Sequence, residues 1–497
     1  MLEQSTTVEG APRATHSLKA GSVGLVGVVF MALATAAPIT AMTGNLPVVI
    51  GAGTGLHAPA GFVFVTLVLT VFTVGYVAMA RHITTAGAFY GFVSYGLGRV
   101  AGMASGLLAV LAYVVFEASV VGIFAYFAQQ TARSQFGVDR PWEVFALAML
   151  AVTALLSYFD LEVAAKVLGV ALVGEVLMLL LWGGAVLAHG GGGGGLRVDS
   201  LNPAGAFSGV NAGVGLFACF WSWIGFESTA MYGEESRNPK RIIPRATLAV
   251  VVGLGVLYTF VAWMVVAGNG TGAVDVAAGA SPLDLFLDPA RRLLGPWAVA
   301  AFQWLMCTSA FACGMAFHQC ASRYLYALGR EGFLLPALGR THPRHGSPYV
   351  ASGVQSLIAL AVVGGFRAAG QDPYASLFTL TAILGTLALL VVQTLCSFAV
   401  IAYFRRHHPE TRHWFRTFTA PLLGGLGMIA AIVLLVTNLD TAAGPASKTL
   451  FFRLIPWIVG AVLLGGVGFA LWMRARSPRR YELMGRLVVE NTRERDG

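Results

Sequence analysis

The chain has 497 residues, of which 57% are hydrophobic, only 11% are charged and 61 are glycine. Since roughly 25% of the residues of an ordinary globular protein are charged, this composition excludes a set of soluble domains. The formal net charge of +9 comes from basic residues in the loops between apolar segments, so we expect no nucleic-acid partner. The composition instead predicts a polytopic membrane protein surrounded by a lipid bilayer.

Long segments that are almost free of charge recur along the whole chain. Each is close to or above the roughly 17–25 residues that cross a hydrocarbon core as a helix, and none alternates like a barrel strand. The sequence therefore predicts an all-α integral membrane protein with twelve transmembrane helices. The expected spans are 22–50, 59–80, 100–128, 142–159, 167–188, 206–233, 246–268, 296–322, 348–366, 374–404, 418–437 and 454–473.

Two of these spans are interrupted near their middle. Pro38 lies inside the first span, and proline removes a backbone donor and clashes with the preceding helical turn. Gly225 and the nearby Glu227 lie inside the sixth span. Interruptions at corresponding positions of two five-helix halves indicate an inverted-repeat transporter with its substrate site at the bilayer midplane. We predict that the two helices break at Thr35–Ile39 and Ser222–Phe226 and that the breaks face each other.

The predicted organisation follows from these two halves. Lysine and arginine are about three times as frequent in the loops on one side, so both termini are expected to face the cytoplasm, in the cell membrane. Residues 1–20 are polar and show no cleavable signal peptide. The expected parts are a cytoplasmic tail at 1–20, helices 1–5 at 21–189, an external glycine-rich loop at 190–205, helices 6–10 at 206–404, helices 11–12 at 405–475 and a cytoplasmic tail at 476–497.

Three stretches of the chain carry a family resemblance. The segments 217–245 and 321–336 closely resemble the sixth and eighth helices, with the loops that follow them, of the amino acid–polyamine–organocation permeases, and 86–90 matches their second-to-third helix connection. The resemblance covers about residues 20–475 and implies a five-plus-five inverted repeat with the last two helices outside the core. Many members have a Gly-Ser-Gly break in the first helix, where this chain has Ala36, Ala37 and Pro38. The proline removes one amide that would hold a substrate carboxylate, and it resembles the putrescine-importer branch.

The breaks and the resemblance together predict a substrate site. Carbonyls near residues 34–36 and 221–224 are expected to accept a substrate ammonium, with Trp221 or Trp223 closing over it by cation–π contact. By resemblance, Glu117 falls at a polar substrate contact of the antiporters and Phe317 near an aromatic gate of the exchangers. The expected substrate-binding residues are Thr35, Ala36, Ala37, Pro38, Ile39, Tyr113, Glu117, Trp221, Ser222, Trp223, Ile224, Gly225 and Phe317.

Three acids lie away from the ends of the predicted spans, namely Glu117, Glu175 and Glu227, and no lysine or arginine lies inside any span. Each intramembrane charge costs about 2.5–3.5 kcal/mol, which a proton, a bound cation or water must offset. We expect a proton-coupling role for Glu175 first and Glu227 second, with His318, the only histidine within any span, as a relay partner. By resemblance, Glu175 falls where proton-coupled relatives have a lysine. Sodium at Thr308 and Ser309 is the alternative.

The predicted function is a secondary active transporter that moves amino acids by alternating access, coupled to protons. The alternative is an importer or exchanger of polyamines or other organic amines with the same fold. An integral-membrane enzyme is disfavoured because no catalytic motif, such as His-Glu-x-x-His or Gly-x-Ser-x-Gly, is present. We expect no cofactor and no metal, and the five cysteines all lie in apolar spans.

Overall fold

The structure is a computed structural model that describes residues 21, 23–83, 87–158, 162–192, 194–233, 235–279, 281–343 and 346–484, with the side chains of 162–168 and 483 left out. The expected N-terminal tail, the end of the C-terminal tail and Ala86 of the third matching stretch lie outside these residues. Within the described ranges the chain forms helices and no strand, apart from two isolated bridges, Val23 with Ser236 and Gly192 with Gly195. The all-α prediction is confirmed.

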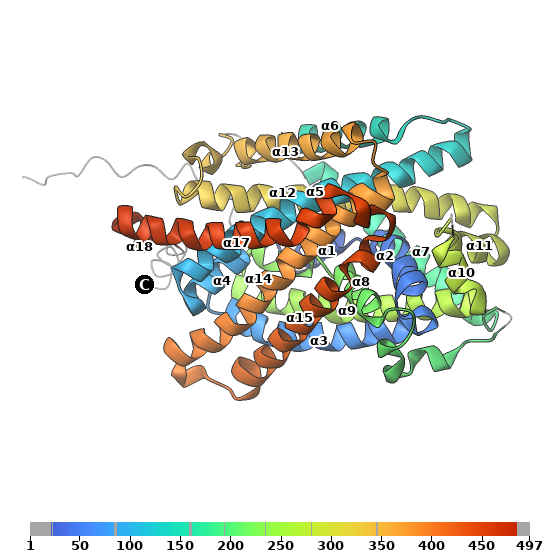
Figure 1. Ribbon diagram of the computed structural model, residues 1–497, viewed down its shortest axis with the longest axis horizontal. Coiled ribbons are helices and arrows are strands. Elements are labelled where there is room, and N and C mark those ends of the chain that lie inside the picture. Colours follow the sequence, from blue (N-terminus) through green and yellow to red (C-terminus); the bar gives the residue numbers. More distant parts are fainter. Residues whose placement is uncertain are drawn as a thin grey trace, which may run out of the picture.

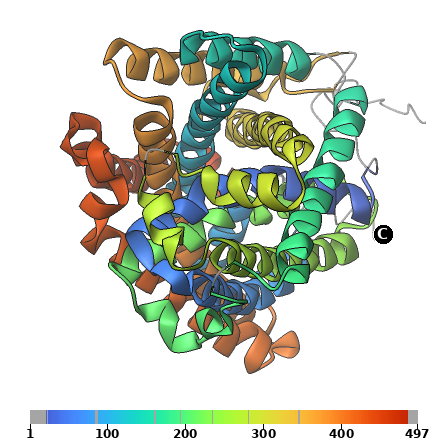
Figure 2. The ribbon, with the colours of Figure 1, turned by 90° about the vertical axis from the view of Figure 1, so that its right-hand side faces the viewer.

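Most of the long helices run lengthwise through the molecule (Figure 1), and a view turned by 90° looks along several of them (Figure 2). The principal helices are α1 (Leu25–Ala36), α2 (Pro38–Val48), α3 (Ala58–Ala80), α4 (Ala88–Leu97), α5 (Arg99–Phe136), α6 (Trp142–Tyr158), α7 (Glu162–Ala188), α8 (Ala212–Ser222), η5 (Phe226–Tyr232), α9 (Pro239–Asn269), α10 (Ala273–Ala278), α11 (Asp284–Leu293), α12 (Pro296–Arg330), α13 (Tyr349–Ala368), α14 (Thr379–Arg406), α15 (Ala420–Thr437), α16 (Leu439–Ala443), α17 (Leu450–Arg476) and α18 (Pro478–Leu483).

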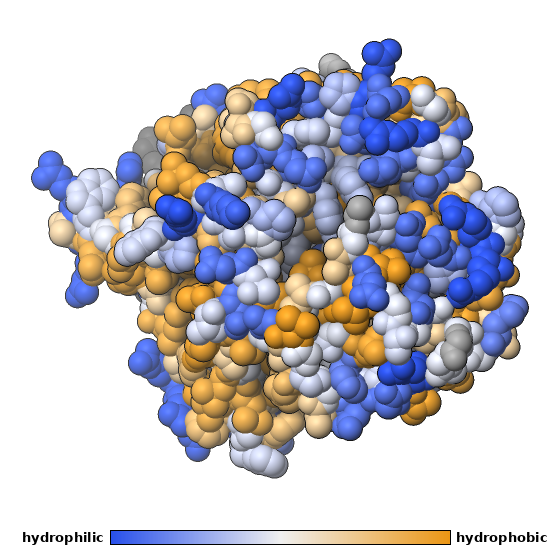
Figure 3. All heavy atoms as spheres, turned by 45° about the vertical axis from the view of Figure 1, so that its right-hand side comes forward, coloured by the Kyte–Doolittle hydropathy of each residue, from blue (hydrophilic) through white to orange (hydrophobic). Residues whose placement is uncertain are grey.

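Ten helical stretches of the described chain are long and apolar enough to cross a membrane, and α6 is a shorter apolar helix. The expected span at 206–233 is absent from these ten because it consists of two short pieces, α8 and η5. The count of twelve spans and the inverted repeat stay predictions. Large apolar side chains such as Leu67, Val256 and Leu464 are exposed on the bundle, and Figure 3 shows apolar residues spread over its surface. A bilayer would cover them.

Both predicted helix breaks are confirmed. Helix α1 ends at Ala36, and Ala37 adopts the left-handed conformation with φ of 44°. Pro38 then begins α2, where its fixed φ suits the first helical position and its missing amide leaves no unpaired donor. The second break lies between the end of α8 and the start of η5, and Gly225 supplies a φ of 115° that other residues rarely adopt.

The two ends of the bundle differ (Figure 1). One end, here called the α18 end, carries α18, the connection from α12 to α13 and the connection from α14 to α15. The opposite end, here called the α11 end, carries α10 and α11. The basic connections from α12 to α13 and from α14 to α15 both lie at the α18 end.

Candidate substrate site

A buried cavity lies where the two helix breaks meet. It contains about 380 Å³ of space free of protein atoms, counting its open side. Helices α1, α2, α5, α8, α12 and the segment before α14 contribute its wall. The lining residues are Thr35, Ala36, Ala37, Thr40, Ala41, Asn45, Phe116, Ser119, Val120, Trp221, Ser222, Ile224, Cys313, Phe317 and Phe378.

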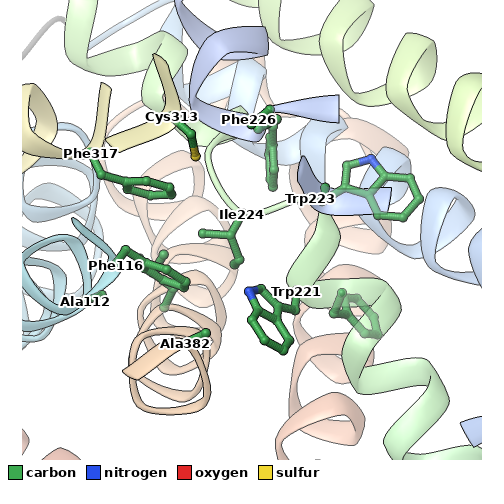
Figure 4. Packing of buried hydrophobic residues seen from close by; sticks show 14 of the residues in the cluster. Ala112, Phe116, Trp221, Trp223, Ile224, Phe226, Cys313, Phe317 and Ala382 are labelled. Atoms are coloured by element: carbon green, nitrogen blue, oxygen red, sulfur yellow. The ribbon is translucent and has the colours of Figure 1, made fainter. Parts of the chain in front are cut away.

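Aromatic rings form two opposed walls of this cavity. The rings of Phe116 and Phe317 stack at a centroid distance of 5.0 Å with an interplanar angle of 17°. Trp221 lies 4.9 Å from Phe378 on the other side. Figure 4 shows Phe116, Phe317 and Trp221 around Ile224, which projects between them. A substrate that fills this space would meet mainly apolar surface.

A few polar groups of the cavity are not used within the protein. The hydroxyl of Thr40 and the amide oxygen of Asn45 are buried without a hydrogen-bond partner in the described chain. The other end of the Asn45 amide donates to Ser222 Oγ at 3.1 Å and so joins α2 to α8. Thr40 lies in the first turn of α2, where backbone donors lack intrahelical acceptors and the helix dipole favours negative charge. These groups suit the polar end of a small zwitterion.

Several groups expected to hold the substrate are already engaged. The amide of Ile39 donates to Glu175 Oε2 at 3.2 Å. The carbonyl of Thr35 accepts from Cys313 Sγ at 3.1 Å, and that of Ala36 accepts from Tyr258 Oη at 3.4 Å. The break in the first helix therefore offers fewer free backbone groups than the sequence suggested.

The predicted site residues divide into two groups. Seven of them line the cavity: Thr35, Ala36, Ala37, Trp221, Ser222, Ile224 and Phe317. The cavity lining does not include Pro38, Ile39, Tyr113, Glu117, Trp223 or Gly225. Trp223 points away from Phe116 and Phe317 in Figure 4, and its indole nitrogen donates to the carbonyl of Val251 at 3.3 Å. Closure of a substrate site by Trp223 is thus not supported, whereas closure by Trp221 fits its position.

Sequence reasoning missed eight lining residues: Thr40, Ala41, Asn45, Phe116, Ser119, Val120, Cys313 and Phe378. Thr40 and Asn45 follow the first break on successive turns of α2, and a search for polar residues after Pro38 would have found them. Phe116 directly precedes Glu117 on α5, and it is Phe116 that faces the cavity. Phe378 has no signal in the sequence, because its position depends on how the chain enters α14.

Glu175 lies behind the first break and outside the cavity lining. Its Oε2 accepts hydrogen bonds from Ser309 Oγ at 2.5 Å and from the amide of Ile39 at 3.2 Å. It therefore joins α7 to α12 and to the start of α2, whose dipole and amides stabilise a carboxylate. Thr308 does not share this contact, because its hydroxyl donates to the carbonyl of Leu305 at 3.2 Å.

Glu227 lies just beyond the second break and ties η5 to α5. Its Oε1 accepts from Tyr113 Oη at 2.8 Å and its Oε2 from the amide of Gly225 at 3.0 Å. The ring of Tyr113 stacks at 5.4 Å on Tyr324 and lies 6.1 Å from Phe317. These rings lie on the parts of α5 and α12 between the cavity and the α18 end.

Glu117, one of the predicted substrate contacts, is not part of the cavity lining. It is buried and directed at His318, whose Nδ1 lies 3.0 Å from Glu117 Oε1, rather than at the cavity. The physical reason is the helical period, since Phe116 and Val120 already occupy the face of α5 that lines the cavity. The hydrogen bonds of His318 go to Glu117 and Ser352, so it has no direct contact with Glu175 or Glu227.

An ion pair lies farther towards the α18 end than these rings. Arg323 Nη2 lies 3.1 Å from Glu235 Oε1, and the guanidinium stacks 4.8 Å from the ring of Tyr232. The amide of Val23 donates to the carbonyl of Glu235 at 3.0 Å and attaches the chain before α1 to the same point.

In the described part of the chain, no group of three or more metal-binding side chains comes together.

A bundle of apolar helices with a cavity between two broken helices is the architecture of an integral membrane transporter. The chain belongs to the amino acid permease family, whose sequence profile matches residues 23–464. The family expectation drawn from the three matching stretches is thereby confirmed.

Individual relatives are distant but span most of the chain. The branched-chain amino acid permease BcaP of Bacillus subtilis (strain 168) is 24% identical over 468 residues, covering 88% of this chain and 90% of the relative. The low-affinity putrescine importer PlaP of Escherichia coli (strain K12) is 23% identical over 346 residues, covering 68% and 74%. Among solved structures, the Eremococcus coleocola manganese transporter matches with a TM-score of 0.56 at 12% identity, over 95% of this chain and 99% of that one. This last likeness supports the fold alone.

Proposed function

We propose that this transporter carries neutral α-amino acids with apolar side chains across the cell membrane by alternating access, coupled to protons. The observation that carries the proposal is the lining of the cavity, which includes no charged side chain and is dominated by alanine, phenylalanine, tryptophan and aliphatic residues. An apolar side chain gains roughly 25 cal/mol for each Å² that it removes from water in such a site. The similarity to branched-chain amino acid permeases supports the same substrate class.

The polar end of such a substrate has partners on α2, after the first break, and on α8, before the second. Thr40, in the first turn of α2, suits the carboxylate because the positive end of the helix dipole lies there. The unpaired Asn45 amide oxygen is an acceptor for the ammonium, and Trp221 is close enough to the same wall to add a cation–π contact. Thr40 and Asn45 belong to α2 and Trp221 to α8, so a bound substrate would contact both interrupted helices.

A polyamine or other organic amine is the alternative substrate. A diamine carries a second ammonium in place of the apolar side chain, and a buried ammonium needs an acidic partner. The three intramembrane acids are not in the cavity lining. Glu175, Glu227 and Glu117 instead bind Ser309, Tyr113 and His318. This placement favours the amino acid, although a putrescine importer is among the relatives.

Proton coupling is assigned first to Glu175. Its carboxylate connects the start of α2, which lines the cavity, to Ser309 on α12. Protonation would remove the charge that the dipole of α2 and these two donors stabilise, and would so loosen α2 from α7 and α12. Glu227 is the second choice, because it links η5 to Tyr113 of α5.

The test uses the full chain purified into proteoliposomes, with both possible orientations present. Radiolabelled leucine, valine, alanine, lysine and putrescine are offered at equal concentration, with and without an inward proton gradient. We expect leucine and valine to accumulate and the gradient to raise the accumulation, while lysine and putrescine remain near the empty-vesicle level. Accumulation of putrescine without leucine would show that the amine importer is the correct function.

A further inference from the structure

A second group of buried polar side chains lies away from the cavity, between α5, α12 and α13. His318 Nδ1 lies 3.0 and 3.1 Å from the two carboxylate oxygens of Glu117. His318 Nε2 lies 2.8 Å from Ser352 Oγ. Gln355 Nε2 donates to Glu117 Oε2 at 2.6 Å. Three helices thus meet at one hydrogen-bonded unit that the proposed transport cycle does not yet use.

The net charge of this unit depends on a single proton. With a neutral imidazole, an ionised Glu117 leaves one uncompensated negative charge in a buried position, which is unfavourable inside a membrane. Another proton on the imidazole makes the pair electrically neutral. No ion pair joins Glu117 to a lysine or arginine in the part of the chain that the structure describes. A proton is therefore the positive charge that completes the unit.

The geometry allows this proton to bind without any rearrangement of side chains. A proton on Nδ1 is directed at Glu117, so the exchangeable position is Nε2, opposite Ser352. The Ser352 hydroxyl donates to a neutral Nε2 and accepts from a protonated one simply by rotating. Ser352 is also the member nearest to water, with 7% of its surface exposed against 1% for Glu117 and 0% for His318. It lies in the first turn of α13, at the α18 end.

The unit is connected directly to the substrate cavity. Phe116 and Phe317, the residues that precede Glu117 and His318, stack on each other and line the cavity. A change in the attraction between Glu117 and His318 therefore acts on the same turns of α5 and α12 that position this aromatic wall.

The other titratable groups of the surrounding helices are engaged elsewhere. On α5 and α12, Tyr113 donates to Glu227, and Arg323 pairs with Glu235. Arg367 of α13 pairs with Glu143 of α6 at the far end of both helices. Tyr349 of α13 and Tyr158 of α6 both contact the ring of His342. The charge state of the unit is thus set mainly by Glu117 and His318 themselves.

We propose that Glu117 and His318 form a second proton-binding site, separate from the substrate cavity and loaded through Ser352 from the α18 end. The incoming proton binds Nε2 of His318, and Glu117 stays ionised opposite the resulting imidazolium. The loaded pair holds α5 against α12 and keeps the wall of Phe116 and Phe317 in place. The link to transport rests on the proposed function, whereas the proton site itself does not.

The first test measures leucine accumulation in proteoliposomes at a gradient of one pH unit. One coupled proton is worth about tenfold in accumulation at this gradient. We expect Glu117→Gln, which removes the charge, and His318→Asn, which keeps a donor near Glu117 but cannot take the proton, each to lower accumulation about tenfold while leucine exchange continues. Ser356→Ala is the matched control. Ser356 lies one turn after Ser352 on α13, and its hydroxyl donates to the backbone carbonyl of Ser352 rather than to Glu117 or His318. Wild-type accumulation in both variants would overturn the link to transport.

The second test needs no substrate. Thermal unfolding of the detergent-solubilised full chain is followed from pH 7 to pH 9.5. As the pH rises, the wild-type pair releases its proton and leaves a buried negative charge, so the unfolding midpoint should fall more steeply than in Glu117→Gln. Equal slopes in the two proteins would overturn the proton site. If the wild type moved no leucine, the proposed function would fail, but the unfolding measurement would still decide whether the proton site exists. If either Glu117→Gln or His318→Asn did not fold, the remaining variant would supply both the accumulation and the unfolding data.

Discussion

Gly225 and Thr35 touch across the two helix breaks, so closely that no larger residue fits at position 225. A Cβ added there would lie 2.7 Å from Thr35 Cγ2 and 2.9 Å from the Thr35 carbonyl carbon. Both partner atoms belong to the wall of the cavity, and one of them is backbone. The contact therefore fixes the distance between the interrupted helices at the level of the substrate.

Gly225→Ala should reduce leucine uptake at least tenfold. The new methyl group must push Thr35 away, and the φ of 115° at this position adds strain for any residue with a side chain. Uptake in proteoliposomes and the elution profile of the purified variant are measured together. Gly253→Ala on α9 is the matched control, because nothing lies within 4 Å of a Cβ there. Wild-type uptake in Gly225→Ala would mean that the two interrupted helices can move apart at this point without loss of transport.

Ala37→Gly should stabilise the protein. Ala37 has a φ of 44°, and the left-handed conformation costs a residue with a side chain about 1–2 kcal/mol. Glycine removes this cost but loses about 0.5–1 kcal/mol through the entropy of the unfolded chain. The expected net gain is about 0.5–1 kcal/mol, seen as a rise of about 1–3 °C in the thermal midpoint. Ala36→Gly, one residue earlier and inside α1, should instead lower the midpoint.

Trp221→Ala should raise the half-saturation constant for leucine uptake. The lost cation–π contact is worth about 0.5–2 kcal/mol, which corresponds to roughly 2- to 30-fold. The maximal rate should change less, because Trp221 covers the substrate without bearing the coupling proton. Trp304→Ala serves as control, since this tryptophan is 49% exposed on the outside of α12. An unchanged constant would remove Trp221 from the site.

Glu175→Gln should separate exchange from accumulation. Glutamine imitates the protonated carboxyl group, so it should hold α2 in the loosened state while its side-chain oxygen can still accept from Ser309 or Ile39. Exchange of internal for external leucine should continue, while accumulation driven by one pH unit should fall at least tenfold. Thr308→Ala is the control, as its hydroxyl only bonds the carbonyl of Leu305. Normal accumulation in both Glu175→Gln and Glu227→Gln would leave sodium or plain exchange as the better account.

A histidine pair at the α18 end should make stability fall in acid. Partial burial, followed by the neighbouring His408, lowers the pKa of His82, and the two rings lie 4.6 Å apart. Because the folded chain binds this proton less readily than the unfolded chain, stability is present above the unfolded pKa and is lost as the pH falls through the lowered pKa. The thermal midpoint of His82→Gln should therefore decrease less between pH 7.5 and pH 5 than that of the wild type. His189→Gln, at the opposite end of the bundle, should behave as the wild type does.

The sequence was sufficient to predict the places where the helices break. Pro38 and Gly225 act through local sterics, which do not depend on the rest of the fold, and both breaks occur where these residues required them. The apolar segments likewise predicted the long helices, because the bilayer imposes their length.

The direction in which individual side chains point could not be predicted in the same way. Glu117 and Trp223 lie in the correct segments but point to His318 and Val251, because each helix is rotated to suit the packing of its neighbours. In an ordinary soluble helix the polar face reveals this rotation, but a helix that is apolar all round gives no such signal. The lining of the cavity therefore required the structure.

The thiol of Cys313 can report when the cavity opens to water. All five cysteines are buried, and Cys313 is one of the residues that line the cavity. A membrane-permeant maleimide should therefore label Cys313 only in those molecules whose cavity has opened to one side or the other, and bound leucine should slow the reaction. With Cys313→Ala as the unlabelled reference, the unmodified protein gives a kinetic record of how often the substrate site meets water, without a single engineered probe.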